Sequence, residues 1–140
     1  VLKVAEASAF KQFLVDNWSA ANNVSLHDWL MYAWFRAQGL AWYIDPCPKI
    51  LYRQHANNQV GANEGVKALM ARLSLMRSGW YRAEIAKITQ LLSADLPTLP
   101  AELKTSGKVP LSFLVKNFNC TRRRLRDRFL LAIVILFGIY

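Results

Sequence analysis

Apolar residues recur at helical spacing in the first 40 residues. Between Ala5 and Trp18 they stand three or four positions apart, which predicts one helix. Ser25 and Asp28 have the spacing of a capping box, in which a serine oxygen accepts a hydrogen bond from the third amide of a helix, and Gly39 is a typical C-terminal stop. A second helix is therefore predicted from about residue 25 to 38. Its centre, residues 31–35, is apolar on every side, so we expect this helix to be buried.

The middle of the chain predicts a small β element followed by more helices. Residues 40–45 and 49–53 are short runs of aromatic and β-branched side chains on either side of two prolines, which favours a hairpin or two edge strands. The polar segment 54–63 reads as a loop. Residues 66–76 and 81–92 then repeat apolar positions at three and four residues and predict an antiparallel helical pair.

Three segments follow from this pattern. Residues 1–92 are predicted to form the main body. Residues 93–110 carry three prolines and are predicted to be a connector, and residues 111–140 are predicted to form a basic, amphipathic helical end. The last segment joins a cluster of arginines to an apolar run of twelve residues that starts at Phe129. A helix needs roughly 20 residues to cross a bilayer, so this run is too short to span one. The arginines are Arg122, Arg123, Arg124, Arg126 and Arg128.

Composition and charge narrow the choice of partners. With 54% hydrophobic residues and 19% charged residues in 140 positions, the chain has enough apolar material to fold. The formal net charge is +9, and residues 71–140 carry twelve basic against four acidic side chains. A basic run beside an apolar helix favours an anionic membrane surface; the alternatives are that the run from Phe129 packs as core or forms a homodimer interface. Nucleic-acid binding is not expected, because no recognisable nucleic-acid motif accompanies the charge.

Cysteine usage and the start of the chain bear on its origin. Two cysteines and two histidines have no zinc-finger spacing and form no disulfide framework, which favours a reducing compartment. The chain begins at Val1 without an export leader, so we expect a piece of a longer protein.

Two motifs in order resemble a known family. Residues 25–30 read SLHDWL and residues 50–61 read ILYRQHANNQVG. They resemble the C-terminal part of bacterial family 2 glycosyltransferases, in particular the rhamnosyltransferase-like group. The Ser-Gly-Trp-Tyr turn at 78–81 extends the resemblance, which covers about residues 24–92. The chain departs from common family forms at Leu30, where tryptophan is frequent, and at Ala56, where glycine is frequent.

The resemblance implies a fold and a reaction. The chain would be the mainly α-helical C-terminal portion, with a small β hairpin, of a GT-A α/β enzyme whose nucleotide-binding half is absent here. The full-length enzyme would transfer a hexose or deoxyhexose, rhamnose among them, with inversion, from a nucleotide sugar to a cell-surface polysaccharide or lipid-linked acceptor. It would use Mg²⁺ or Mn²⁺ and lie at the cytoplasmic membrane face. This chain alone has no Asp-x-Asp cation motif, and we expect it to be inactive and to bind no cofactor.

The resemblance also implies roles for individual residues. Asp28 matches the general base that deprotonates the acceptor hydroxyl, although a purely structural cap at this position would hold the same carboxylate on helix amides. His55 matches a histidine that reaches the cation or diphosphate, and Arg53 would add charge there; a loop histidine bonded to backbone and a solvated arginine are the structural alternatives.

Three further residues are candidates for sugar contacts. His27 and Trp29 flank the proposed base, and Asn58 lies within the second motif. Each also has a structural interpretation, as a packed histidine, a core tryptophan or a turn former. The rival function is a non-catalytic helical adaptor that binds membranes or proteins through its basic apolar tail.

Overall fold

The computed structural model describes residues 3–41, 47, 66–122 and 124–138. These residues form helices and no strand. The mainly helical fold predicted from the sequence is therefore confirmed. The predicted hairpin lies outside the described residues except for positions 40, 41 and 47, none of which is in a strand. The helices are α1 (Val4–Asp16), α2 (Trp18–Ala21), α3 (His27–Ala37), α4 (Val66–Arg77), α5 (Trp80–Leu91), α6 (Ala101–Ser106), α7 (Leu111–Thr121) and α8 (Leu125–Leu136).

The first predicted helix is two helices that meet at Asn17. This residue leaves the helical region, with φ −116° and ψ 25°, and its side-chain amide donates to the carbonyl of Phe13 at 2.9 Å. A short amide side chain that bonds to nearby backbone competes with the helical ladder, which explains the break. The predicted end of α3 is confirmed, because Gly39 follows it with φ +70°.

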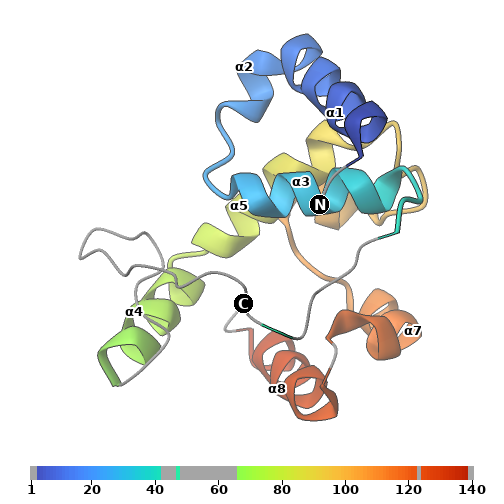
Figure 1. Cartoon of the computed structure of the whole chain (residues 1–140). Helices are drawn as coiled ribbons and strands as arrows, with labels where there is room; N and C mark the ends of the chain where they lie inside the picture. Colours follow the sequence, from blue (N-terminus) through green and yellow to red (C-terminus); the bar gives the residue numbers. More distant parts are fainter. Residues whose placement is uncertain (1–2, 42–46, 48–65, 123, 139–140) are drawn as a thin grey trace.

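The core lies where α1 and α5 pack against α3 (Figure 1). Phe10 on α1 meets Trp34 and Phe35 on α3 at ring-centroid distances of 5.2 and 5.9 Å. The prediction that α3 is buried all round is wrong, since Trp29 is 38% exposed and Tyr32 is 46% exposed. The neighbouring helices cover only part of its circumference. The buried residues of this core are Ala21, Val24, Leu30, Trp34, Phe35, Ile88 and Leu92.

The predicted connector, residues 93–110, contains the helix α6. Pro100 precedes the helix, where a missing N–H costs nothing, and Leu103 is buried. The Thr89 hydroxyl on α5 donates to the Leu103 carbonyl at 3.0 Å. At the end of α6, Gly107 passes so close to α5 that an added Cβ would lie 1.9 Å from the Arg82 carbonyl oxygen. This part of the chain is therefore packed against α5 rather than crossing a free surface.

Helices α4 and α5 do not form the predicted antiparallel pair. Gly79 joins them with φ +73°, and Figure 1 shows α4 leading away from the start of α5 rather than lying along it. Further along, α7 and α8 pack on each other through Phe118 and Phe129, whose rings lie 5.3 Å apart. Among the helices of the described ranges, none is long and apolar enough to cross a membrane.

Candidate functional site

The proposed base lies in the first turn of α3. A tight turn precedes this helix, with the Val24 amide bonded to the Ala21 carbonyl at 3.1 Å, and Leu26 is the N-cap residue. His27 and Asp28 are the first two helical residues, and both are exposed. Within the described part of the chain, the Asp28 carboxylate accepts no hydrogen bond and forms no ion pair.

The predicted capping box is wrong. Ser25 lies one residue before the N-cap, and no side chain caps α3 from within its own sequence. The Ser25 hydroxyl instead donates to Oε1 of Glu84, on α5, at 3.2 Å. Leu26 has no side-chain oxygen to take the serine's place. Asp28 is therefore not tied to helix amides, and the competition between a cap and a base does not arise at this residue.

Glu84 is the acceptor for the backbone that enters α3. Its side chain is only 1% exposed, and its Oε2 accepts hydrogen bonds from the Ser25 amide at 2.7 Å and the Leu26 amide at 3.4 Å. Lys87 donates to Glu84 Oε1 at 2.6 Å and to the Asn23 carbonyl at 2.9 Å. A buried carboxylate is tolerated when donors surround it in this way.

Opposing effects act on the pKa of Glu84. Burial raises the pKa, whereas hydrogen bonds from Lys87 and from the Ser25 amide, the charge of Lys87 and the Leu26 amide lower it, and together they bring it below its ordinary value of 4.5. The carboxylate is therefore ionised at neutral pH. Glu84 is not among the residues predicted from the sequence, although a signal exists: it shares the helical face of Tyr81 and Ile88 and has a lysine three residues later.

Aromatic rings lie beside the first turn of α3. Trp29 stacks on Tyr81 of α5 with centroids 6.0 Å apart and planes inclined by 19°, and Trp80 meets Tyr81 edge-on at 5.1 Å. Trp34 is a core residue, whereas Trp29 keeps part of its surface open. A flat apolar surface of this kind suits the C–H face of a sugar ring.

The predicted cation and diphosphate residues, Arg53 and His55, lie outside the described residues, and so does the predicted sugar contact Asn58. Within residues 3–41, 47, 66–122 and 124–138, no group of three or more histidine, cysteine, aspartate or glutamate side chains is positioned to hold a metal ion. The role of His55 therefore stays a prediction.

Helix α8 presents an apolar face to solvent. Leu125, Phe129, Ile133 and Leu136 are spaced by four, four and three residues, so they share one side of the helix, and all are exposed. Leu130 and Phe137 widen this surface, which we call the α8 apolar face.

Three of the predicted membrane-facing arginines are exposed near the start of this face. These are Arg122, Arg124 and Arg126. Arg128 is bonded to the Arg122 carbonyl at 2.7 Å and to Oδ1 of Asn119 at 3.3 Å. Arg123 lies outside the part of the chain that the structure describes.

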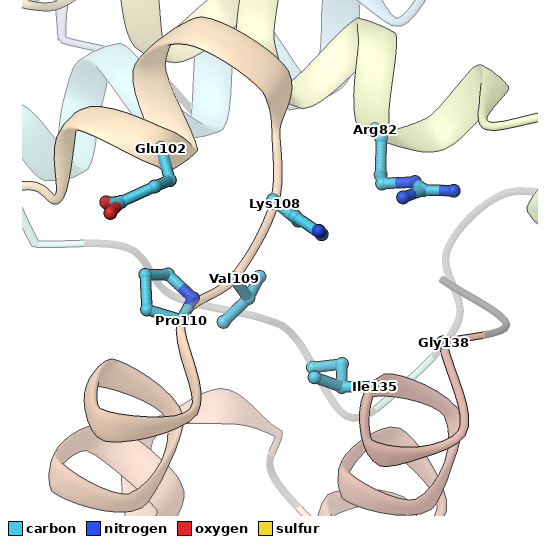
Figure 2. A pocket seen from close by; sticks show the side chains of 7 residues that line it. All are labelled: Arg82, Glu102, Lys108, Val109, Pro110, Ile135 and Gly138. Carbon is cyan, nitrogen blue, oxygen red and sulfur yellow. The ribbon is translucent and has the colours of Figure 1, made fainter.

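A cavity of about 520 Å³ lies between α5, the segment after α6 and the end of α8 (Figure 2). Two of its lining side chains are cationic, and Figure 2 shows the Glu102 carboxylate directed away from both. Of the predicted site residues that the structure describes, none lines this cavity, which is separate from the first turn of α3. Its lining residues are Arg82, Glu102, Lys108, Val109, Pro110, Ile135 and Gly138.

The chain is similar to a known transferase along its whole length. It is 37% identical over 140 residues to the dTDP-rhamnosyl transferase RfbG of Shigella flexneri, and the match covers 48% of that protein. The chain therefore spans about half the length of this curated relative. The similarity extends past residue 92 into the segment that forms α6, α7 and α8. No protein-family model matches the chain, and no solved structure matches it.

Proposed function

We propose that this chain is the acceptor-side part of an inverting glycosyltransferase of family 2 and GT-A type, which transfers a deoxyhexose such as rhamnose from a nucleotide sugar. The observation that carries the proposal is the similarity to the dTDP-rhamnosyl transferase, which runs through both motifs and on to the end of the chain. The acceptor in this proposal is a hydroxyl of a growing cell-surface glycan. Nothing in the similarity favours the rival adaptor function.

Asp28 is the general base in this mechanism. A sugar hydroxyl is a weak nucleophile until its proton is removed, and a positioned carboxylate removes it as the oxygen attacks the anomeric carbon. The attack comes from the face opposite the leaving diphosphate, so the anomeric centre inverts. The exposed Asp28 carboxylate has no competing hydrogen bond in the described part of the chain, which leaves its oxygens available for the acceptor proton.

The residues next to the base bind the sugars. Trp29 and Tyr81 offer a stacked aromatic surface, and stacking against a sugar ring would place its hydroxyl groups at the first turn of α3. His27 is exposed in the same turn and is proposed to donate a hydrogen bond to the acceptor. Asn58, within the second motif, is a further proposed sugar contact.

The negative charge of the leaving diphosphate must be neutralised by groups other than those in the first turn of α3. In the full-length enzyme, His55 and Arg53 are proposed to face the diphosphate, together with groups of the nucleotide-binding half. Mg²⁺ or Mn²⁺ bound there would stabilise the negative charge on the departing nucleoside diphosphate.

The second part of the proposal concerns location. We propose that the α8 apolar face rests on the cytoplasmic leaflet of the cell membrane, with Arg122, Arg124 and Arg126 near anionic headgroups. Exposed apolar side chains of this extent mark an interaction surface, and adjacent arginines favour an anionic one. An enzyme held there meets acceptors that are anchored to lipid.

The test of the reaction is nucleotide-sugar turnover by the full-length protein. Nucleoside diphosphate release is measured with a panel of donors, an acceptor extract and Mg²⁺ or Mn²⁺. We expect Asp28→Asn to lower kcat by about 100-fold or more, because the loss of a general base costs 10²- to 10⁴-fold. Asp16→Asn, at an exposed carboxylate on α1, is the matched control. Full activity of a folded Asp28→Asn protein would show that Asp28 is not the base.

The test of location is binding to vesicles with and without anionic lipid. Ile133→Asp, in the centre of the α8 apolar face, should weaken binding at least tenfold, because an apolar side chain that enters the interface contributes about 1.5–3 kcal/mol when fully buried. Val15→Asp, at an exposed valine on α1, is the control and should bind as the wild type does. If Ile133→Asp instead left vesicle binding unchanged and turned a dimer into a monomer, the face would be a subunit interface.

A further inference from the structure

One face of α5 contacts the first turn of α3 at two points. Tyr81, Glu84 and Ile88 are spaced by three and four residues and so lie on one side of α5. Ile88 belongs to the buried core, Glu84 accepts hydrogen bonds from the backbone at Ser25 and Leu26, and Tyr81 stacks on Trp29. The face thus links the core to the backbone that carries Asp28.

These contacts enclose Asp28 along the sequence. The Glu84 contacts fall two and three residues before it, and the Tyr81 contact falls one residue after it. The direction of a side chain in a first helical turn depends on the backbone at the N-cap and on the start of the helix. Holding both sides of Asp28 therefore limits how far its carboxylate can move.

No local group replaces Glu84 in this arrangement. The Ser25 and Leu26 amides come before the first intrahelical hydrogen bonds of α3, and the N-cap leucine has no side-chain oxygen. Glu84 reaches them from 59 and 58 positions along the chain. Lys87 anchors the carboxylate from the opposite side and also donates to the Asn23 carbonyl, so the turn is held at both ends.

We propose that Glu84 is a positioning residue for the general base: its carboxylate fixes the backbone at Ser25 and Leu26 and thereby directs Asp28 at the acceptor hydroxyl. This inference rests on the proposed function, because it concerns the same site. A base must lie within hydrogen-bond reach of the proton it removes, and a displacement of about 1 Å can cost 100-fold in rate. Glu84 touches no substrate in this scheme and acts only through the backbone.

The kinetic test compares Glu84→Gln with Glu102→Gln in the full-length protein. Glutamine keeps one oxygen but loses the charge that the two amides and Lys87 require, so we expect kcat to fall by about 10- to 100-fold while the KM for the donor changes by less than about twofold. Glu102 is an exposed carboxylate on α6, and its replacement should leave both constants unchanged. Ser25→Ala removes a single hydrogen bond to Glu84, keeps the two amide bonds, and should have a smaller effect.

Hydrogen exchange at the amides of Ser25 and Leu26 tests, without an activity assay, whether Glu84 holds this backbone in place. Both amides should exchange faster in Glu84→Gln, while exchange in α1 stays as in the wild type. Unchanged exchange, or faster exchange with unchanged kcat, would overturn the proposal. A parallel fall of kcat and rise of KM with loss of the folded fraction would mean that Glu84 only maintains stability.

The two proposals fail in different ways. If the wild-type protein released no nucleoside diphosphate from any donor, the proposed function and the role of Glu84 toward Asp28 would both fall. The exchange data would still show whether Glu84 orders the turn.

Discussion

Removing the Glu84 carboxylate should destabilise the protein by an amount that the structure allows us to work out. In Glu84→Ala, the Ser25 and Leu26 amides lose their acceptor, and a buried donor without a partner costs about 1–3 kcal/mol. The Leu26 bond is long, at 3.4 Å, so it contributes at the low end. Lys87 is 42% exposed and can turn to water, so its loss of a partner adds little. We expect a total of about 2–4 kcal/mol in the free energy of unfolding.

The pH dependence of this effect has a definite sign. The pKa of Glu84 is lower in the folded protein than its ordinary value of 4.5. The ionised carboxylate therefore stabilises the fold fully above about pH 4.5, and this contribution is lost as the pH falls through the lowered pKa. Glu84→Gln cannot titrate, so the stability difference between wild type and this variant should be constant from pH 7 to 5 and should shrink in more acidic solution.

The assay is urea unfolding followed by circular dichroism at pH 7, 5, 4 and 3. Glu102→Gln, which removes an exposed carboxylate, is the control and should track the wild type at every pH. The free energy of unfolding should differ less between wild type and Glu84→Gln at pH 3 than at pH 7. If this difference stayed the same down to pH 3, or grew, Glu84 would not be an ionised, hydrogen-bonded acceptor.

Two further predictions concern packing. Gly107→Ala should destabilise the protein by about 2–5 kcal/mol, because an added Cβ would meet the Arg82 carbonyl and the left-handed backbone adds strain. Gly39→Ala has a similar φ but open space around the Cβ, so it should cost only about 1 kcal/mol, and equal effects of the two substitutions in thermal unfolding would contradict the close approach of α6 to α5. Leu92→Ala should cost about 2–5 kcal/mol because Leu92 is fully buried, whereas Met70→Ala, at an exposed site, should change stability by less than about 0.5 kcal/mol. Chemical denaturation of both variants checks this contrast.

The helices were predictable from the sequence because their signals are local. Apolar spacing identified the segments that became α3, α4 and α5, and Gly39 and Gly79 marked where α3 and α4 end. The break at Asn17 was not predicted, because the apolar repeat continues across it while a side-chain amide takes a helix carbonyl. Helix α6 was hidden by the prolines around it, which suggested a loop although Pro100 precedes a helix.

The candidate site was predictable only in part, because its supporting contacts are distant in sequence. Asp28 is proposed as the base from a motif, but the capping box predicted for it is wrong: the acceptor for Ser25 comes from α5, 59 residues away. The exposure of Trp29 depends on which neighbours cover α3, and a single apolar run carries no information about them. A charged residue on an otherwise apolar helical face, such as Glu84 between Tyr81 and Ile88, indicates that a distant part of the chain supplies its hydrogen-bond partners.

The number of basic side chains in residues 71–140 overstates the electrostatic attraction that this segment could have for an anionic membrane. Glu84 neutralises Lys87, and Arg126 lies beside Asp127. Arg128 keeps its charge, but its hydrogen bonds to Asn119 and to the Arg122 carbonyl hold the guanidinium against the protein. The exposed arginines at the start of α8 would contribute about 1 kcal/mol each near an anionic surface, and salt screens that contribution. In the proposed attachment to a membrane, stable binding would then depend on the α8 apolar face, since apolar burial is not screened by salt. On this argument, raising the salt concentration weakens vesicle binding without abolishing it, whereas one aspartate in the centre of the face has the larger effect.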